Sequence, residues 1–153
     1  MLVADRCRAA SGVKLPPLAG AALACALLAG CGTAGQSKQT PAFDGIAPAD
    51  TIEAVGTEPF WNLRIADGEL TYTTPENLDG TTIAVDRFAG NSGLAFSGTV
   101  DGAPLDLVVT RGMCSDGMSD RRYPFTATLR IAEEQREGCA WTERQPFSGP
   151  RAP

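Results

Sequence analysis

Residues 94–109 read LAFSGTVDGAPLDLVV, two short runs of alternating apolar and polar residues on either side of Asp101-Gly102. Such alternation buries one face of a strand and leaves the other in water, which is typical of antiparallel sheet. An Asp-Gly pair suits the two central positions of a type I′ turn, because both take positive φ. The sequence therefore predicts a β-hairpin made of Leu94–Val100 and Ala103–Val109.

The same period of two recurs outward from this hairpin. Apolar and polar residues alternate at positions 60–65, 69–73, 82–86 and 125–131. Asp67-Gly68, Asp79-Gly80 and the glycines of 90–93 supply turns. No stretch between residues 51 and 141 has the period of an amphipathic helix. We therefore predict an all-β fold, a small antiparallel meander closed into a barrel of seven or eight strands, because closure leaves no exposed edges. A sandwich of two sheets is the alternative.

The first thirty residues are organised as an export signal. Arg6, Arg8 and Lys14 precede an apolar run, Leu18–Ala29, of twelve residues, whereas a spanning helix needs about 20. The sequence Leu28-Ala29-Gly30-Cys31 then matches the bacterial lipobox, whose cysteine accepts a diacylglyceryl group. We predict a lipoprotein signal peptide at 1–30 and lipid on Cys31 that holds the protein on a membrane. A plain secretory signal or an N-terminal transmembrane helix is the alternative.

Composition divides the rest of the chain into three parts. Residues 31–50 contain Gly, Ser, Thr, Gln and Pro and little apolar bulk, and we predict a flexible tether. Residues 51–141 carry the alternating runs and are the predicted barrel domain. Residues 142–153 contain Pro146, Pro150 and Pro153 without periodicity. We expect this tail to be disordered or loosely docked.

Processing accounts for the odd number of cysteines. Cys7 and Cys25 leave with the signal and Cys31 takes the lipid, so Cys114 and Cys139 remain for a compartment in which thiols oxidise. We predict one disulfide between them, worth about 3.5 kcal/mol in the loop-entropy model. The alternative is two free thiols.

The charged residues limit the chemistry. The sequence has no histidine, which excludes Ser-His-Asp and Cys-His catalysis and metal sites with histidine ligands. Without the signal, which removes one of 18 acids and three of 13 bases, the net charge is −7. This charge argues against a nucleic-acid partner and would suit a cationic one, or it only keeps the surface soluble. We expect no enzyme activity, no metal and no cofactor.

The segment Gly56-Thr57-Glu58-Pro59-Phe60-Trp61 departs from the alternation. Pro59 marks a bend or the entrance of a strand. Phe60 and Trp61 are adjacent and must point to opposite faces of a strand. Trp61 falls on the same face of the strand as Leu63 and Ile65, and we predict that it packs in the core. Phe60 would be an aromatic binding spot if it were exposed, but we favour its being covered by the tail.

A second departure, Met113 to Phe125, is a polar loop between two strands. Its candidate binding residues are Ser115, Asp116, Gly117, Ser119, Asp120, Arg121 and Tyr123. Long ordered loops on a rigid scaffold often carry binding groups. The alternative is a purely structural loop, because Asp and Ser cap turns and Asp120 can pair with Arg121 or Arg122. The spacing of Asp116 and Asp120 lacks the pattern of a calcium loop.

Together these motifs resemble a known family. The runs Gly56–Trp61, Cys114–Arg121, Tyr123–Phe125 and Gly138–Ala140 are similar to largely uncharacterised envelope lipoproteins of Gram-negative bacteria. The likeness covers Ile52 to Trp141. Some members are grouped with small barrel domains similar to membrane-bound inhibitors of c-type lysozyme, which implies an eight-stranded barrel with a disulfide, and lysozyme inhibition. The inhibitors' own loop motifs, Ser-Gly before Tyr and Thr-Lys-Gly, are not evident here.

These observations favour one function over two others. We expect a lipid-anchored envelope lipoprotein whose β-domain binds a partner or has a structural role without catalysis. Inhibition of c-type lysozyme, a cationic protein, is the second hypothesis, and a hydrolase that uses carboxylates alone is the third. Gly32 stands after Cys31, where Asp would indicate retention in the inner membrane. We therefore expect the outer membrane, on the side that faces the periplasm.

Overall fold

The computed structural model describes residues 42–150 of the 153-residue chain, all within one compact unit. The predicted signal peptide, Cys31 and most of the predicted tether lie outside the described residues. Within residues 42–150 the chain forms nine β-strands and no helix. The strands are β1 (Ile52–Thr57), β2 (Phe60–Ala66), β3 (Glu69–Thr74), β4 (Asn77–Ala84), β5 (Asp86–Ala89), β6 (Gly93–Val100), β7 (Ala103–Cys114), β8 (Tyr123–Ile131) and β9 (Glu134–Thr142). No helix of this part of the chain is long and apolar enough to cross a membrane.

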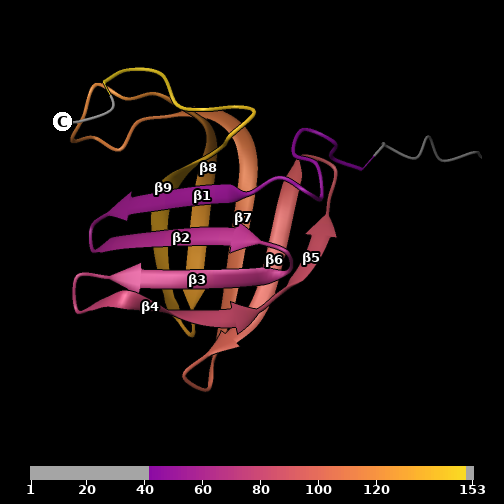
Figure 1. Ribbon diagram of the computed structural model, residues 1–153, viewed down its shortest axis with the longest axis vertical. Helices are drawn as coiled ribbons and strands as arrows, with labels where there is room; N and C mark the ends of the chain where they lie inside the picture. The colour runs from indigo at the N-terminus through magenta and orange to yellow at the C-terminus, as the bar shows by residue number, and fades with distance from the viewer. Residues whose placement is uncertain (1–41, 151–153) are drawn as a thin grey trace, which may run out of the picture. The chain divides into compact units, whose positions relative to one another are not determined.

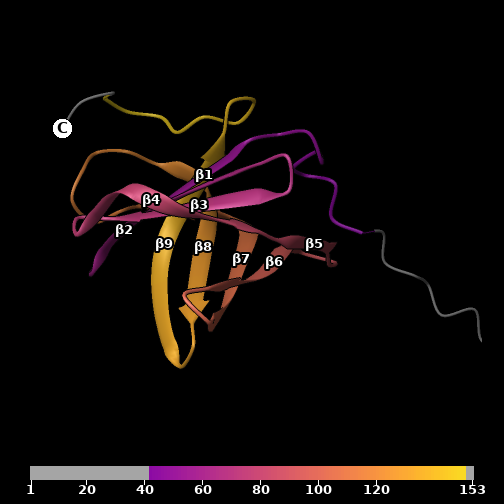
Figure 2. The ribbon, with the colours of Figure 1, turned by 60° about the horizontal axis from the view of Figure 1, so that its bottom comes forward.

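The strands form one antiparallel sheet in the order β4-β3-β2-β1-β9-β8-β7-β6-β5. Each strand pairs with its neighbours in sequence, except that β1 pairs with β9, and β4 and β5 do not pair with each other. The meander is therefore a nearly closed barrel. In Figure 1, β1–β4 run across β6–β9, and Figure 2 shows the two groups as crossing layers.

The predicted fold class is confirmed, with nine strands where seven or eight were expected. The run at 82–86, which we interpreted as one strand, divides at Val85. The backbone N–H of Val85 donates to the carbonyl of Gly68 instead of to a neighbouring strand, so β4 ends before it and β5 begins after it.

The hairpin predicted at residues 94–109 is β6–β7. Val100 pairs with Ala103, and the two turn residues between them have φ of 51° at Asp101 and 78° at Gly102. Both φ values are positive, as a type I′ turn requires. The strand alternation is confirmed here as well, because Leu105, Leu107 and Val109 are buried.

The large side chain of Trp61 lies in the core, as predicted, because two glycines leave room for it. A Cβ atom at Gly56 would lie 2.1 Å from Nε1 of the indole, and one at Gly138 would lie 2.6 Å from its Cζ2. The indole is thus held between β1 and β9. Its Nε1 is buried without a hydrogen-bond partner among the described residues.

Both ends of the folded domain extend beyond the predicted boundaries. Ile46, which we placed in the tether, is 1% exposed and belongs to the core. The segment around it is fixed at the barrel, since Phe43 N donates to Gly90 O and the guanidinium of Arg87 donates to Ile46 O. Burial of single apolar side chains orders this segment, although it has no periodicity.

The tail after β9 is also packed against the domain, as far as Pro150. The backbone groups of Ser148 and Arg122 form two hydrogen bonds. The side-chain amide of Gln145 donates to Gly45 O, so the tail also contacts the segment before β1. Its described part is docked through specific contacts, so of the two expected states, disordered or loosely docked, the structure excludes disorder for residues 142–150.

Candidate binding groove

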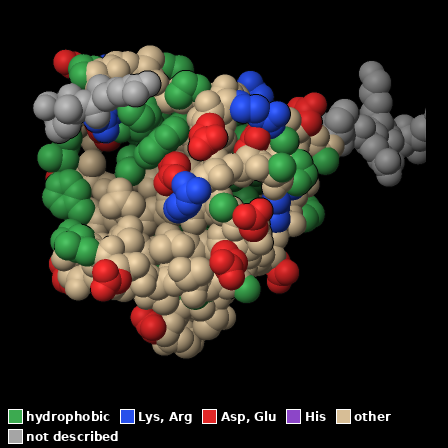
Figure 3. Space-filling model, in the orientation of Figure 1, with side chains coloured by type: hydrophobic (Ala, Val, Ile, Leu, Met, Phe, Trp, Pro, Cys, Tyr) green, Lys and Arg blue, Asp and Glu red, His purple; other side chains and the backbone are tan. Residues whose placement is uncertain are grey.

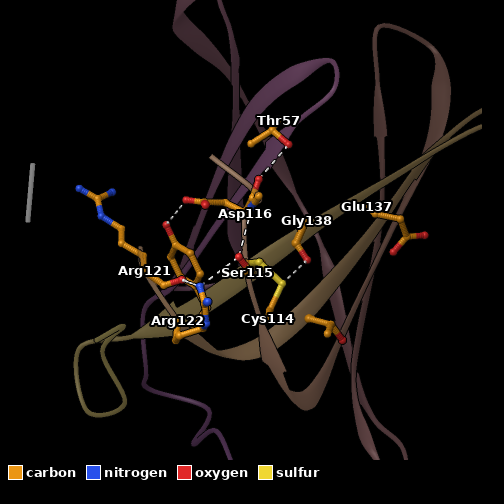
Figure 4. The surroundings of a disulfide bond; sticks show 12 residues. Thr57, Cys114, Ser115, Asp116, Arg121, Arg122, Glu137 and Gly138 are labelled. Atoms are coloured by element: carbon orange, nitrogen blue, oxygen red, sulfur yellow. Dashed lines mark hydrogen bonds between the residues drawn. A yellow bond between two sulfur atoms is a disulfide. The ribbon is translucent and has the colours of Figure 1, made fainter. Parts of the chain in front are cut away.

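The two segments that depart from the alternation meet on the outer face of the barrel. Thr57 Oγ1 donates to the backbone carbonyl of Asp116 at 3.3 Å, which joins the end of β1 to the loop after β7 (Figure 4). Between them lies a groove of about 290 Å³. We call it the main groove. Figure 3 shows a hollow beside the β1–β2 turn, with hydrophobic side chains on its rim.

The floor of the main groove is formed by the outward side chains of β1 and β2. Thr57 pairs with Phe60 and Val55 pairs with Asn62, and all four line the groove. Phe60 is 51% exposed, so it is not covered as we had favoured. The side-chain amide of Asn62 makes no hydrogen bond within residues 42–150.

The wall of the groove is the loop from Ser115 to Arg122, and Asp116 holds this loop in shape. One carboxylate oxygen, Oδ1, accepts the backbone N–H groups of Met118 at 3.1 Å and Ser119 at 2.9 Å. The other, Oδ2, accepts the hydroxyls of Ser119 at 2.7 Å and Tyr123 at 3.1 Å. A carboxylate has about four lone-pair sites, and these four donors fill them. Asp116 is therefore a structural anion with no free site for a ligand.

The same contacts set the charge of the groove. Burial raises the pKa of the Asp116 carboxyl, but hydrogen bonds from Ser119, Met118 and Tyr123 outweigh it and lower the pKa to about 2. Burial is also the largest cause of the raised pKa of Tyr123. At neutral pH the site thus holds a fixed carboxylate and a neutral phenol.

The tail fastens the loop from outside. The ring of Phe147 lies 5.5 Å from that of Tyr123 and 5.5 Å from that of Trp141, and the guanidinium of Arg121 lies 4.8 Å above Phe147. Arg121 Nε donates to Pro150 O at 2.8 Å. These contacts make the tail part of the site, which the sequence did not reveal.

A disulfide bond fixes the end of the loop that follows β7. Cys114 and Cys139 form the predicted disulfide, with Cα atoms 5.5 Å apart, and it ties the end of β7 to β9. Arg122 donates to Ser115 Oγ at 3.2 Å, and Figure 4 shows these two side chains close together. Asp120 is exposed.

A second hollow of about 240 Å³ lies on the other side of the Thr57–Asp116 contact. It shares Val55, Gly56, Thr57 and Asp116 with the main groove. Its own lining includes Glu137 and the disulfide. Neither Asn62 nor Glu137 was among the predicted site residues, although Asn62 shares the outward parity of Phe60 and could have been found from it.

The arrangement suits binding better than proton transfer. The acidic groups with displaced pKa, Asp50, Asp116 and Glu134, are all shifted downward, whereas a carboxyl that acts as an acid near neutral pH needs a raised pKa. The described residues contain no group of three or more His, Cys, Asp or Glu side chains placed to hold a metal ion.

The predicted candidates are thus partly brought together. Ser119, Arg121 and Tyr123 line the main groove with Phe60 and Trp61, whereas Ser115 lies in the second hollow. Gly117 has a φ of 72° and serves the turn of the loop. In comparisons with models of protein families, with curated proteins and with solved structures, the chain matches none of them.

Proposed function

We propose that this chain is a lipid-anchored envelope lipoprotein whose barrel binds a ligand in the main groove without catalysis. One observation carries the proposal. A loop whose shape is fixed by Asp116 encloses a groove with exposed apolar side chains at its rim, Phe60 at 51% and Met118 at 66%. Exposed apolar groups next to a preformed hollow are typical of binding sites.

The rigidity of the wall supports binding over a purely structural role. Four hydrogen bonds to the Asp116 carboxylate, the disulfide and the docked tail all hold the loop in one conformation. A wall that is already ordered loses little conformational entropy when a ligand enters.

The location rests on the sequence of the first residues, with support from the disulfide. The lipobox that ends at Cys31 predicts the lipid, and a disulfide is expected in an oxidising compartment such as the periplasm. The test is metabolic labelling with a fatty acid, followed by fractionation of the envelope. A Cys31→Ser variant that still carried the label would contradict the anchor.

Binding can be tested with the methionines of the mature chain. Met118 lines the main groove, whereas Met113 is 75% exposed and lies outside it. In protein labelled with ¹³C-methyl methionine, envelope fractions and purified c-type lysozyme are added one at a time. We expect a binding component to shift the Met118 methyl signal and to leave that of Met113 in place. If no component moves Met118, the groove is not a binding site for envelope components.

A further inference from the structure

We infer that the outer face of β5–β7 lies against the membrane that holds the lipid anchor, with Phe88 and Val108 as its apolar contacts. This inference rests on the proposed lipid anchor at Cys31 and deepens it, because it says which side of the barrel faces the bilayer. It follows from the pairing of three strands, from the place where the chain enters the domain, and from the charges near that place.

A row of apolar side chains crosses the outer face of these three strands. Phe88 pairs with Ala95, and Ala95 pairs with Val108. Directly paired residues point to the same side of a sheet. The next residues along β6 and β7, Phe96 and Leu107, are buried in the core, so the row points outward. Phe88 is 68% exposed and Val108 is 41% exposed.

The polar side chains next to the row are bonded to one another. Asp106 and Thr110 lie on either side of Val108 along the outer face of β7. Asp106 forms an ion pair with Arg130, and the hydroxyls of Thr110 and Thr126 lie 2.7 Å apart. Polar groups that already have partners lose less when water leaves them than groups without partners. This face can therefore approach the headgroup boundary of a bilayer.

The chain enters the domain beside the row. The backbone N–H of Phe43 donates to the carbonyl of Gly90, two residues after Phe88. Twelve peptide units join Cys31 to Phe43, and they reach about 40 Å at most. A bilayer that holds the lipid on Cys31 therefore stays within this distance of the entry point. Such tethering makes a weak second contact effective, because that contact becomes intramolecular.

The charges near the entry point are balanced, unlike those of the chain as a whole. The predicted mature chain has a net charge of −7, and anionic headgroups repel an acidic domain. Near the entry point two acids, Asp44 and Asp86, stand beside two bases, Arg87 and Arg111. The Arg111 guanidinium lies 5.8 Å from the centre of the Phe43 ring. This side of the barrel therefore meets less repulsion at a membrane than an acidic side would.

The size of the row argues against a protein partner. A stable protein interface buries about 800 Å² on each side. The row offers only two strongly exposed apolar side chains, Phe88 and Val108, which are too few for that area. A membrane contact needs less area, because the lipid already holds the domain at the surface.

The test measures how close two positions lie to the bilayer. Lipidated protein is placed in phosphatidylcholine vesicles that contain a nitroxide-labelled lipid, and a fluorophore is attached to Phe88→Cys or to Leu78→Cys. Leu78 is 82% exposed on β4, and Figure 1 shows the start of β4 and β5 on opposite sides of the domain. Cys114 and Cys139 do not take the label, because they form the disulfide. We expect strong quenching at position 88 and weak quenching at position 78.

A second pair of variants tests the Phe88 side chain itself. The fluorophore is attached to Val108→Cys. The added change Phe88→Ser should lower its quenching about threefold, because membrane binding scales with the buried apolar area. The matched control Leu78→Ser removes an exposed apolar side chain from β4 and should leave the quenching unchanged. An unchanged urea midpoint shows that the variants are folded.

The contrary results differ in what they overturn. If the protein floats with the vesicles but positions 88 and 78 are quenched equally, or if Phe88→Ser has no effect, the inference is wrong and the proposed anchor stands. If the position-88 fluorophore shifts to the blue in vesicle-free Cys31→Ser protein as its concentration rises, a second copy covers the row, which also overturns the inference. If the wild type carries no lipid, the inference and the proposed anchor both fail.

Discussion

Replacement of Asp116 by Asn should destabilise the protein in a way that depends on pH. The side chain keeps its size but loses its charge, and charge-assisted hydrogen bonds are roughly twice as strong as neutral ones. Folding lowers the pKa of this carboxyl from 3.8 to about 2. A shift of this size corresponds to at most about 2.4 kcal/mol. Because the loop is partly exposed to water, we expect about 1–2 kcal/mol at pH 7.

The sign follows from the direction of the pKa shift. A lowered pKa in the folded state stabilises the protein above the pKa of the unfolded chain, and this stabilisation is lost as the pH falls from about 4 towards 2. At pH 3 about half of it is gone. The difference in stability between the wild type and Asp116→Asn should therefore shrink by about half between pH 7 and pH 3.

Urea unfolding with the disulfide intact measures this difference. Tryptophan fluorescence reports the transition at pH 7 and at pH 3, and the linear extrapolation gives the free energy of unfolding. Asp86→Asn, at an exposed aspartate of β5, is the matched control for loss of one negative charge. A difference between the wild type and Asp116→Asn that is the same at both pH values would refute the role of the carboxylate as an anion fixed by hydrogen bonds.

Three further changes test other parts of the site. Gly56→Ala places a methyl group 2.1 Å from the Trp61 indole. We expect this overpacking to lower the free energy of unfolding in urea by about 1–3 kcal/mol. Wild-type stability would contradict the close packing. Replacement of both Cys114 and Cys139 by Ser opens a loop with a sequence separation of 25. It should lower the free energy of unfolding by about 3.5 kcal/mol in the same assay. A loss below about 1 kcal/mol would contradict a loop-entropy role. Phe147→Ala removes two aromatic contacts, each worth about 0.5–1.5 kcal/mol. It should speed hydrogen exchange at the Ser148 and Arg122 amides while the amides of β8 stay protected. Unchanged exchange would show that the ring does not hold the tail.

The fold could be predicted because its strands follow a simple physical rule. Most inward positions of β6, β7 and β8 are apolar, and the two-residue turn Asp101-Gly102 joins β6 to β7, so the alternation and the Asp-Gly pairs predict the meander. The longer connection at 115–122 between β7 and β8 is the loop of the groove. The disulfide followed from the expectation that Cys7 and Cys25 leave with a signal peptide and that Cys31 takes a lipid, which leaves Cys114 and Cys139 as a pair. The strand break at Val85 did not follow, because it depends on a hydrogen bond to Gly68, which lies in a different hairpin.

The site could be predicted in part. Both segments were found because they interrupt the alternation, and the packing of Trp61 followed from its parity. The contact between the segments was not accessible, since Thr57 and Asp116 are far apart in sequence and meet only because β1 pairs with β9. The docked ends were missed for a related reason: Ile46 and Phe147 are isolated apolar residues, and a single buried side chain leaves no periodic pattern.

The pairing of β1 with β9 also determines the order in which the domain can assemble. The hairpins β6–β7, β7–β8 and β8–β9 join residues that are close in sequence, so each can form as soon as its own segment is available. The pairing of Ile52 with Thr142 joins the two ends of the domain and must wait for the last strand to be made. Until then one edge of β1 is unpaired and open to pairing with other chains. We therefore expect closure of the barrel to be the slow step of folding, and the newly made protein to be most prone to aggregation just before β9 arrives.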